Sequence, residues 1–367
     1  MPTVADVLRR YGGEYLQRFG AKMPAEQKKV LHAIMACRTG ELGTVFYACT
    51  SCGRTHAMGR SCGNRHCPTC QQDKTRNWLE KQTTRLLPCP YFLVTFTLPE
   101  ELRTFVRANQ RVCYAALFEA SSEALKTLAA DPKYIGTKLP GFFGVLHTWG
   151  RTLEYHPHVH YVVPGGGVSN DGGQWLPSRA DFFVPVKALS IIFRAKFRDA
   201  MRRAGLLSRI APAVWRMDWV VHSQAVGDGR ASLKYLAPYV FRVAISDRRI
   251  VSCDDGKVVF SYRKSGTSHW RPMTLEATEF IRRFLQHVLP TGFPKVRHYG
   301  FLSPNSKHSI EAVRWLIALY HGRLFLLLAR ATSATPQPPR IRCAACGGAM
   351  CVIGFARPPH RTYFDTS

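Results

Sequence analysis

Two pairs of cysteines near the N-terminus place the strongest constraint on how this chain can fold. "CTSC" supplies Cys49 and Cys52, "CPTC" supplies Cys67 and Cys70, and fourteen residues separate the pairs. Two CxxC knuckles at such a spacing can present four thiolates in a tetrahedron, which is typical of a structural zinc site. The sequence therefore predicts that these four cysteines bind one Zn²⁺ and hold a small module folded around it.

Further donors lie within or beside the two knuckles. Cys37, Cys62 and His66 are possible extra zinc ligands, and His56 lies between the knuckles. Either one ion takes four ligands from this set or two ions share it, and one ion on the two knuckles is the simpler interpretation. The alternative for Cys62 and His66 is that they pack inside the module or orient a ligand.

A smaller group of cysteines follows the segment "ATSATPQPP" (residues 331–339), whose composition is typical of a linker. "CAAC" supplies Cys343 and Cys346, but one knuckle is only half a zinc site. Cys351 or His360 could complete the site, although the spacing of neither is favourable. No metal is therefore assigned to this tail.

A third group of donors lies in "YHPHVHYVVP" (residues 155–164), which has the composition of a strand. Side chains at alternate positions of a strand point to one face, so His156, His158 and His160 share a face while Val159 packs behind. His158 and His160 can share a divalent cation and leave coordination positions open, as a catalytic site requires. His156 is the geometrically favoured third ligand, and the alternatives are Glu154, His222 and Gln224.

Two tyrosines in "KYLAPYVFR" are candidates for nucleophiles. Tyr235 and Tyr239 are four residues apart, so on a helix they share a face. A phenol with a pKa of about 10 is a poor nucleophile unless a metal or nearby cations assist it. Two half-buried aromatic side chains are the alternative. Pro238 removes a helical hydrogen bond between them, so the two hydroxyls need not be equivalent.

The charge of the chain indicates a partner of opposite sign. The 367 residues include 51 Lys and Arg against 24 Asp and Glu, a net charge of +27. Nucleic acid is the favoured partner, because neutralised phosphates release counterions, and an anionic membrane is the second choice. Cations beside the motifs are expected to contact DNA: Arg65, Lys74, Arg76, Lys234, Arg242 and Arg248.

The N-terminal segment and the cysteine content suggest a reducing compartment. The first 20 residues have apolar side chains at helical spacing and do not resemble a signal peptide. Twelve cysteines without such a signal favour metal ligation over disulfides. We therefore expect a cytoplasmic protein with no membrane segment.

Strands mixed with long helices predict an α+β fold. Helices are expected over residues 1–30, 71–87, 100–130, 187–205, 232–243 and 274–289. Strands are expected over residues 91–99, 142–150, 156–163, 219–224 and 258–263, with the second and third as neighbours and a hairpin over 168–176.

The motifs occur in an order that resembles a known family. "SCGNRHCPTCQ" precedes "HPHVHYVVPGGG", and "YLAPYVFRVAISDRRI" and "FIRRFLQHVLPTGFPKVRHYG" follow. Together these motifs, which span residues 37–300, resemble the two-tyrosine rolling-circle transposases of the insertion-sequence ninety-one family, which belong to the HUH single-strand endonucleases. The residue Pro238 departs from the family's usual basic residue between the tyrosines.

The resemblance implies a fold, an activity and roles for the motifs. The fold implied is an HUH-endonuclease palm, an antiparallel sheet with flanking helices, preceded by a zinc-binding module. His158 and His160 would bind Mg²⁺ or Mn²⁺, Tyr235 and Tyr239 would be the nucleophiles, and the knuckles would bind Zn²⁺. The activity implied is nicking and rejoining of single-stranded DNA at element ends, with target DNA as a further partner, in the nucleoid of a bacterium.

The same resemblance suggests how the chain is divided. Residues 1–88 would form the N-terminal helix and zinc-binding domain, 89–300 the nuclease domain, 301–330 a helical extension, and 331–367 a linker and cysteine-bearing tail. Two alternative functions remain open at this level. A plasmid or phage replication initiator or relaxase would use the same chemistry, and a non-catalytic zinc protein would only bind nucleic acid.

Overall fold

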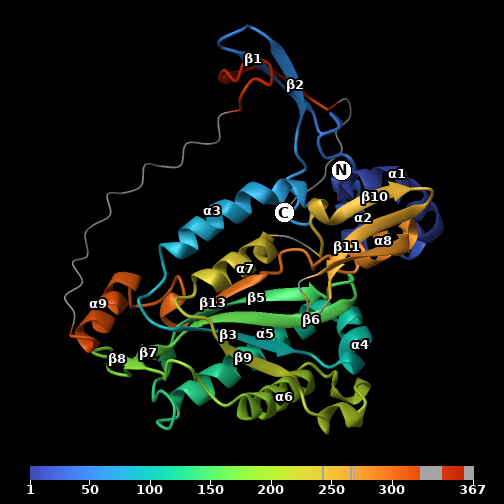
Figure 1. Ribbon diagram of the computed structural model, residues 1–367. Coiled ribbons are helices and arrows are strands. Elements are labelled where there is room, and N and C mark those ends of the chain that lie inside the picture. Colours follow the sequence, from blue (N-terminus) through green and yellow to red (C-terminus); the bar gives the residue numbers. More distant parts are fainter. Residues whose placement is uncertain (242–243, 265–266, 268, 323–340, 359–367) are drawn as a thin grey trace.

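A five-stranded antiparallel sheet forms the centre of the protein (Figure 1). The computed structural model describes residues 1–241, 244–264, 267, 269–322 and 341–358. In the order β13-β5-β6-β3-β9, the strands are Val296–Tyr299, Phe142–Trp149, Tyr155–Pro164, Tyr91–Thr97 and Val221–Ala225. β-Branched and aromatic residues fill these strands, which explains their extended conformation. The neighbouring strands expected at 142–150 and 156–163 are confirmed as β5 and β6.

Helices α5 (Gln110–Ala130) and α6 (Val186–Arg203) cover one face of this sheet. Phe96 of β3 and Tyr161 of β6 point to this face and pack edge-on, with ring centroids 5.8 Å apart. Phe193 of α6 lies 5.1 Å from Phe96, and the buried hydroxyl of Tyr161 lies 2.7 Å from the hydroxyl of Ser121 on α5. Apolar packing on this face is thus combined with satisfied polar groups, and both stabilise the core.

The opposite face of the sheet is covered by helix α7 (Arg230–Phe241), with α3 (Gln72–Thr83) beside it (Figure 1). Leu233 and Val240 of α7 belong to the same buried cluster as Val145 of β5 and Val162 of β6. Because side chains alternate along a strand, Val162 shares its face with His158 and His160. Helix α7 therefore lies on the histidine face of the sheet.

A second core joins the N-terminal helices to a later part of the chain. Helices α1 (Val4–Phe19) and α2 (Ala25–Met35) pack with α8 (Ala277–Leu285) and with the sheet of β10 (Ile250–Asp254), β11 (Lys257–Arg263) and β12 (Trp270–Glu276). The helix expected from residue 274 begins at Ala277, because residues 270–276 pair with β11 as a strand that the sequence did not predict. This packing joins residues from both sides of the boundary expected at residue 88. The domain limits remain a prediction.

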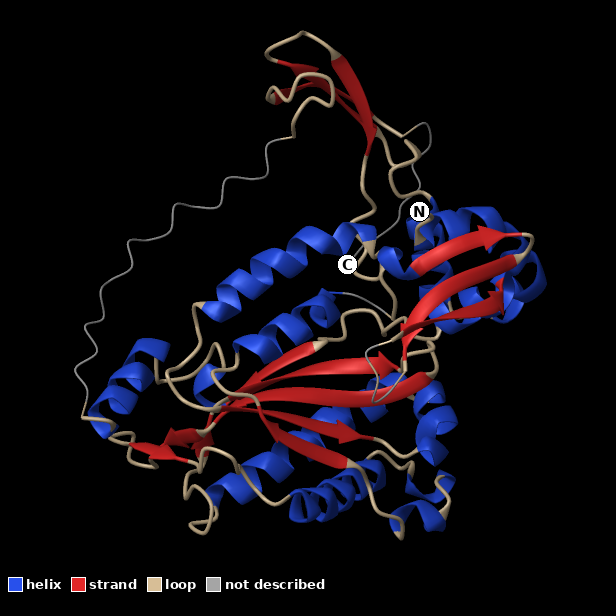
Figure 2. Cartoon of the chain, viewed as in Figure 1, coloured by secondary structure: helices blue, strands red, loops and turns tan. Residues whose placement is uncertain are grey.

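Two smaller sheets complete the structure (Figure 2). One contains β1 (Thr44–Cys49), β2 (Thr55–Gly59) and β14 (Met350–Ala356), and it projects from the body. The other contains β4 (Leu139–Pro140), β7 (Gly166–Val168) and β8 (Trp175–Pro177), and its β7–β8 pair confirms the expected hairpin. The remaining α-helices are α4 (Arg103–Ala108) and α9 (Ile310–Tyr320).

Among the described residues, no helix combines the length and the apolar composition needed to cross a membrane. The linker expected at residues 331–339 lies outside the described residues.

Gly144 of β5 faces Tyr161 of β6, and a Cβ atom there would lie 2.4 Å from the buried tyrosine ring. We expect Gly144→Ala to lower the free energy of unfolding by about 1–3 kcal/mol, the usual cost of overpacking a rigid core. Thermal unfolding followed by circular dichroism measures this change. Gly354→Ala in β14 is the matched control, because its Cβ would meet no atom within 4 Å. Equal melting temperatures for the two variants would contradict the expectation.

Candidate metal centres and active site

Three histidines from two neighbouring strands form a cluster on the face that α7 covers. His147 of β5 lies directly opposite His158 of β6, and His160 follows two residues later on β6. One ring nitrogen of each histidine lies within 4.8 Å of the others. All three side chains are at least nine-tenths buried, with exposures of 3%, 8% and 9%. The strand pairing thus gathers three imidazoles at one point.

Hydrogen bonds fix the orientation of the two β6 rings. Nδ1 of His158 donates to the backbone carbonyl of His156 at 2.6 Å. Nδ1 of His160 lies 2.7 Å from Oγ1 of Thr95, which is directly opposite on β3. Because Nδ1 is engaged in each ring, a metal would bind through Nε2. Such hydrogen-bond partners set the tautomer and the direction of histidine ligands.

Burial keeps these rings in the neutral form that binds metals. It lowers the pKa of His160 to about 4 and the pKa values of His147 and His158 well below the usual 6.5. The other imidazoles add to the effect, since a second positive charge nearby is unfavourable. At neutral pH all three are therefore ready ligands that need no deprotonation.

The structure places His147, and not the expected third ligand His156, in the histidine cluster. His156 is only partly buried and lies outside the cluster, and its Nδ1 accepts a hydrogen bond from Nη2 of Arg103 at 3.0 Å. The alternatives Glu154, His222 and Gln224 are exposed and also lie outside it. The alternation rule finds residues on one strand only, whereas His147 comes from the neighbouring strand. A histidine in "FFGVLHTWG", a predicted neighbour of β6, was the available clue.

The donor set suits a divalent ion with open coordination positions. Three imidazoles leave at least one position for a substrate oxygen. Imidazole ligands fit a transition-metal ion better than Mg²⁺, which prefers oxygen ligands. Of the two ions expected from the resemblance, this set therefore fits Mn²⁺ better.

Both candidate nucleophiles are residues of helix α7. Tyr235 and Tyr239 are one helical turn apart, as expected, while the placement of their side chains lies outside what the structure describes. The helix contacts β5, the strand of His147. Lys234 on the same helix is exposed, and Arg242 lies outside the described residues.

The cysteines form two separate clusters, each with four sulfur atoms. Cys37, Cys62, Cys67 and Cys70 make up the first cluster, in which the Cys70 sulfur lies 3.5 Å from that of Cys37 and 3.6 Å from that of Cys62. A tetrahedral zinc ion with Zn–S bonds of about 2.3 Å separates its sulfur ligands by roughly 3.8 Å. The first cluster therefore fits a structural Zn²⁺ and includes the expected extra ligands Cys37 and Cys62.

The predicted grouping of the two knuckles was wrong. Cys67 and Cys70 belong to the first cluster, whereas Cys49 and Cys52 lie in the second, together with Cys343 and Cys346. The stretch between Cys37 and Cys62 contains β1, the first knuckle and β2, so the chain leaves the first cluster, forms the projecting sheet and returns. Spacing alone could not distinguish this path from a direct one.

Two residues of the first module serve structure rather than the roles expected of them. His66 is buried, its Nδ1 lies 3.1 Å from Oδ1 of Asn64, and its Nε2 accepts from the amide of Leu289 at 3.1 Å. Both nitrogens are thus engaged, so His66 does not fit a zinc ligand. Arg65 donates to the carbonyls of Pro290 and Phe293, each at 2.7 Å, so a DNA contact does not fit this residue either.

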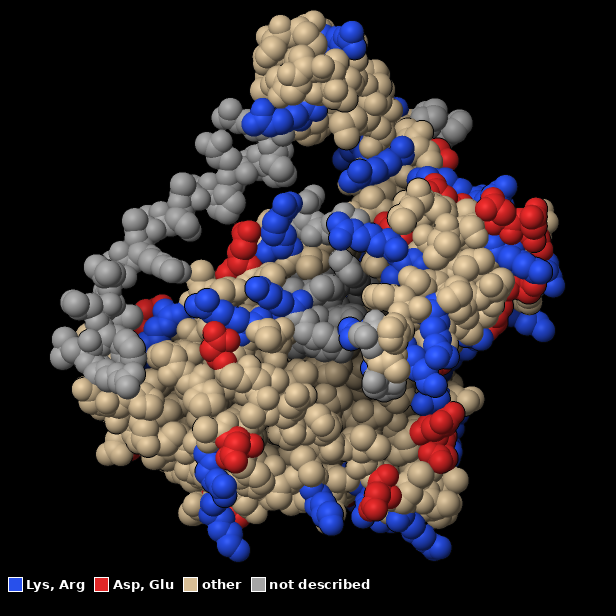
Figure 3. Space-filling model, viewed as in Figure 1, with Lys and Arg blue, Asp and Glu red and all other residues tan. Residues whose placement is uncertain are grey.

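Exposed cations follow the outer side of α3. Lys74, Arg76 and Lys81 are exposed on this helix, and Figure 3 shows Lys and Arg gathered there and at the base of the projecting sheet. Arg248, beyond α7, is exposed as well. Such a row can follow a phosphate backbone.

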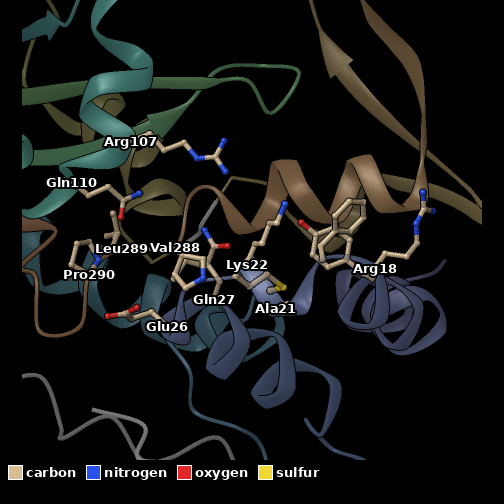
Figure 4. Close-up of a pocket in the computed structure, with 14 residues that line it drawn as sticks. Arg18, Ala21, Lys22, Glu26, Gln27, Arg107, Gln110, Val288, Leu289 and Pro290 are labelled. Atoms are coloured by element: carbon tan, nitrogen blue, oxygen red, sulfur yellow. The ribbon is translucent and has the colours of Figure 1, made fainter. Parts of the chain in front are cut away.

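A cavity of about 550 Å³ lies elsewhere, where α1 and α2 approach α4 and α5 (Figure 4). Arg18, Lys22 and Arg107 line it together with apolar side chains such as Leu289. None of the clustered histidines or cysteines lines this cavity, so it is separate from the metal-binding candidates.

Comparisons with known proteins match most of the chain. The family described as "Putative transposase" matches residues 141–309, and "Transposase zinc-binding domain" matches residues 7–98. "Putative transposase y4qJ" of Sinorhizobium fredii is 41% identical over 322 residues, which cover 82% of this chain and 80% of the relative. "Transposase for insertion sequence element IS801" of Pseudomonas savastanoi pv. phaseolicola is 29% identical over 296 residues, or 74% and 68% of the two chains. No solved structure matches this chain.

The geometry of the histidine cluster generates a prediction about metal affinity. His147→Ala should weaken Mn²⁺ binding by at least about 100-fold, because even partners that only orient a ligand change metal affinity by about 10- to 100-fold. Isothermal titration calorimetry on the full chain measures this affinity. His156→Ala is the matched control and should change it by less than about threefold. A larger loss in His156→Ala than in His147→Ala would contradict the assignment.

Proposed function

The chain belongs to the transposases of the insertion-sequence ninety-one family, and on this premise we propose that it nicks and rejoins single-stranded DNA through a 5′-phosphotyrosine intermediate. The substrate would be the ends of its element and the target DNA, as in rolling-circle transposition. One observation carries the proposal: a buried cluster of three neutral imidazoles lies on the sheet face covered by the helix with two tyrosines.

An HUH-type palm is the architecture that this proposal requires. The five-stranded antiparallel sheet with helices on both faces is consistent with it. His158 and His160 occupy the centre of the sheet, on β6, and are held by backbone and threonine partners. Rigid elements of this kind can hold a reacting phosphate in a fixed position.

The cleavage step requires little besides positioning and charge stabilisation. A divalent ion held by His147, His158 and His160 would polarise the non-bridging oxygens of the scissile phosphate. A tyrosine hydroxyl of α7 attacks phosphorus, so that a Tyr–O–P bond forms and the bond from phosphorus to the 3′ oxygen breaks. The proton lost by the phenol is balanced by the one gained at the 3′ hydroxyl. Rejoining reverses these steps and needs no ATP, because the phosphotyrosine bond retains the phosphodiester's energy.

Tyr235 and Tyr239 would each attack a different DNA end. A single nucleophile is occupied once it holds one 5′ end, whereas a second tyrosine on the same helical face can cut again before the first end is released.

DNA binding would rest on cations outside the metal site. The net charge of +27 and the exposed row on α3 support a path for the strand along this helix. Binding energy from phosphates is largely independent of base sequence. The neutral imidazoles contribute nothing to this attraction, so binding and cleavage should be separable by mutation.

The proposed nucleophiles can be tested by trapping the covalent adduct. The full chain is incubated with Mn²⁺ and a single-stranded oligonucleotide of the element's terminal sequence, labelled at its 3′ end so that the fragment joined to protein keeps the label. The double variant Tyr235→Phe/Tyr239→Phe should form no labelled adduct on a denaturing gel, because only the hydroxyls are removed. Tyr320→Phe on α9, where the side chain is exposed, is the control and should form it normally. An adduct in the double variant would rule out the mechanism.

The proposed path of the strand predicts a change in salt dependence. Lys74→Ala/Arg76→Ala should reduce the slope of log affinity against log salt by about 1.4, since each phosphate contact to a single strand contributes about 0.7. Fluorescence anisotropy with a labelled oligonucleotide at several salt concentrations measures this slope. Lys133→Ala/Lys138→Ala removes the same charge from the exposed loop after α5 and should leave the slope nearly unchanged. Equal slopes for the two double variants would refute the path.

A further inference from the structure

Four cysteines from opposite ends of the chain meet at the tip of the projecting sheet. The sulfur of Cys49 lies 3.5 Å from that of Cys346, and the sulfur of Cys52 lies 3.8 Å from that of Cys343. All four sulfurs lie within 4.8 Å of one another. A disulfide would require about 2.05 Å, whereas sulfur ligands around a tetrahedral zinc ion lie roughly 3.8 Å apart. The distances thus match a shared ion.

The two knuckles have the same backbone geometry although their sequences are 290 residues apart. In each, a glycine follows the second cysteine with a left-handed φ, +70° at Gly53 and +72° at Gly347. The amide of each glycine donates to the carbonyl of the first cysteine, at 3.0 Å to Cys49 and 2.8 Å to Cys343. Both first cysteines also donate their amides to the carbonyl five residues later, each at 2.9 Å. Chance proximity of free thiols would not produce two equivalent turns.

Strand pairing holds the second knuckle in register with the first. β14 pairs antiparallel with β1 from Thr44↔Ala356 to Cys49↔Met350. The amide of Thr50 donates to the carbonyl of Ala349 at 2.9 Å. Gly348 permits this approach, because a Cβ there would lie 2.5 Å from Oγ of Ser51. The C-terminal segment is therefore an integral part of the sheet.

The projecting sheet has no hydrophobic core of its own that could explain its fold. Along β1, β2 and β14, Cys49 is the only residue that is buried. Apolar side chains that would form a core are instead exposed, 58% for Ile353 and 72% for Phe355. Three short strands without a buried face are not stable alone, and small modules of this kind depend on metal ligation.

We propose that Cys49, Cys52, Cys343 and Cys346 bind a second Zn²⁺, so that the C-terminal segment closes a zinc ribbon begun near the N-terminus. His56 lies outside the ligand set, with Nε2 3.6 Å from the sulfur of Cys343, where it supports the thiolate. The matched zinc-binding family covers residues 7–98 and thus contains only half of these ligands. The site gives the tail a metal that the sequence alone did not assign, since each knuckle completes the half-site of the other.

Zinc content of double variants of the full chain tests this site. Cys343→Ser/Cys346→Ser should lower bound zinc by one ion per chain, as measured by inductively coupled plasma mass spectrometry after exhaustive dialysis. Cys49→Ser/Cys52→Ser should lower it by the same one ion, and the quadruple variant should lose no more than either double variant. This lack of additivity distinguishes one shared ion from two independent ions.

Two controls keep the outcome specific. Cys351→Ser changes an exposed cysteine of β14 that lies outside the cluster, and it should leave the zinc content unchanged. Cys67→Ser/Cys70→Ser should remove a different ion, so that combining it with Cys343→Ser/Cys346→Ser lowers zinc by two. The site is overturned if Cys343→Ser/Cys346→Ser retains all zinc, or if the quadruple variant loses two ions.

Cobalt substitution provides a second readout that does not depend on counting ions. Co²⁺ bound by four thiolates absorbs in the visible range with the intensity of a tetrahedral site. Apo protein titrated with Co²⁺ should lose about half of this absorbance in Cys343→Ser/Cys346→Ser, because one of two tetrathiolate sites is absent. Unchanged absorbance in that variant would overturn the proposal, and His56→Ala should leave the absorbance near the wild-type value.

Discussion

The antiparallel pairing of β5 with β6 is the constraint on which the rest of the molecule depends. It places His147 opposite His158 and Val145 opposite His160. Because side chains alternate, the residues between the histidines point the other way, and Tyr161 anchors the sheet to α5 and α6. Alternate residues of β6 therefore have different roles. One set packs into the core, and the other set carries candidate metal ligands. A shift by one residue would turn the histidines into the aromatic core and turn the tyrosine toward α7, so the packing fixes the site.

The N-terminal module is tied to the rest of the protein by buried and partly buried polar contacts as well as by apolar packing. Asp247 accepts from the amide of Val4 at the start of α1 and from the hydroxyl of Thr69 within the CPTC knuckle, each at 3.0 Å. His66 and Arg65 bond to the backbone of the segment after α8. A buried polar group that loses its partner is costly, so these contacts hold one orientation. The first cysteine cluster therefore positions α3, with its cations, relative to the sheet that bears the histidines.

Local patterns predicted much of this structure, and the errors share one physical cause. Strand alternation found His158 and His160, and helical periodicity found α6 and α7, because both patterns depend only on neighbours in sequence. His147, the partition of the knuckles, and Cys343 with Cys346 depend on which strands become neighbours in space. The sequence predicts a helix from residue 274, but pairing with β11 makes residues 274–276 the end of the strand β12. The second four-cysteine set could not be deduced from spacing, because Cys52 and Cys343 are 291 residues apart.

The charged side chains and the neutral histidine cluster lie in different parts of the protein. The cations are spread over the surface, where solvent and salt screen them, and they suit reversible attraction to a phosphate backbone. The histidine cluster is buried and neutral, so it offers lone pairs in a region of low dielectric constant, where a single divalent ion acts strongly on a nearby phosphate. A protonated imidazole there would repel that ion, and burial prevents this protonation by lowering the pKa values. In the proposed mechanism, the exposed helices would attract the DNA, and the histidine cluster would gain positive charge only when a metal is bound, so that binding and cleavage would depend on different parts of the protein.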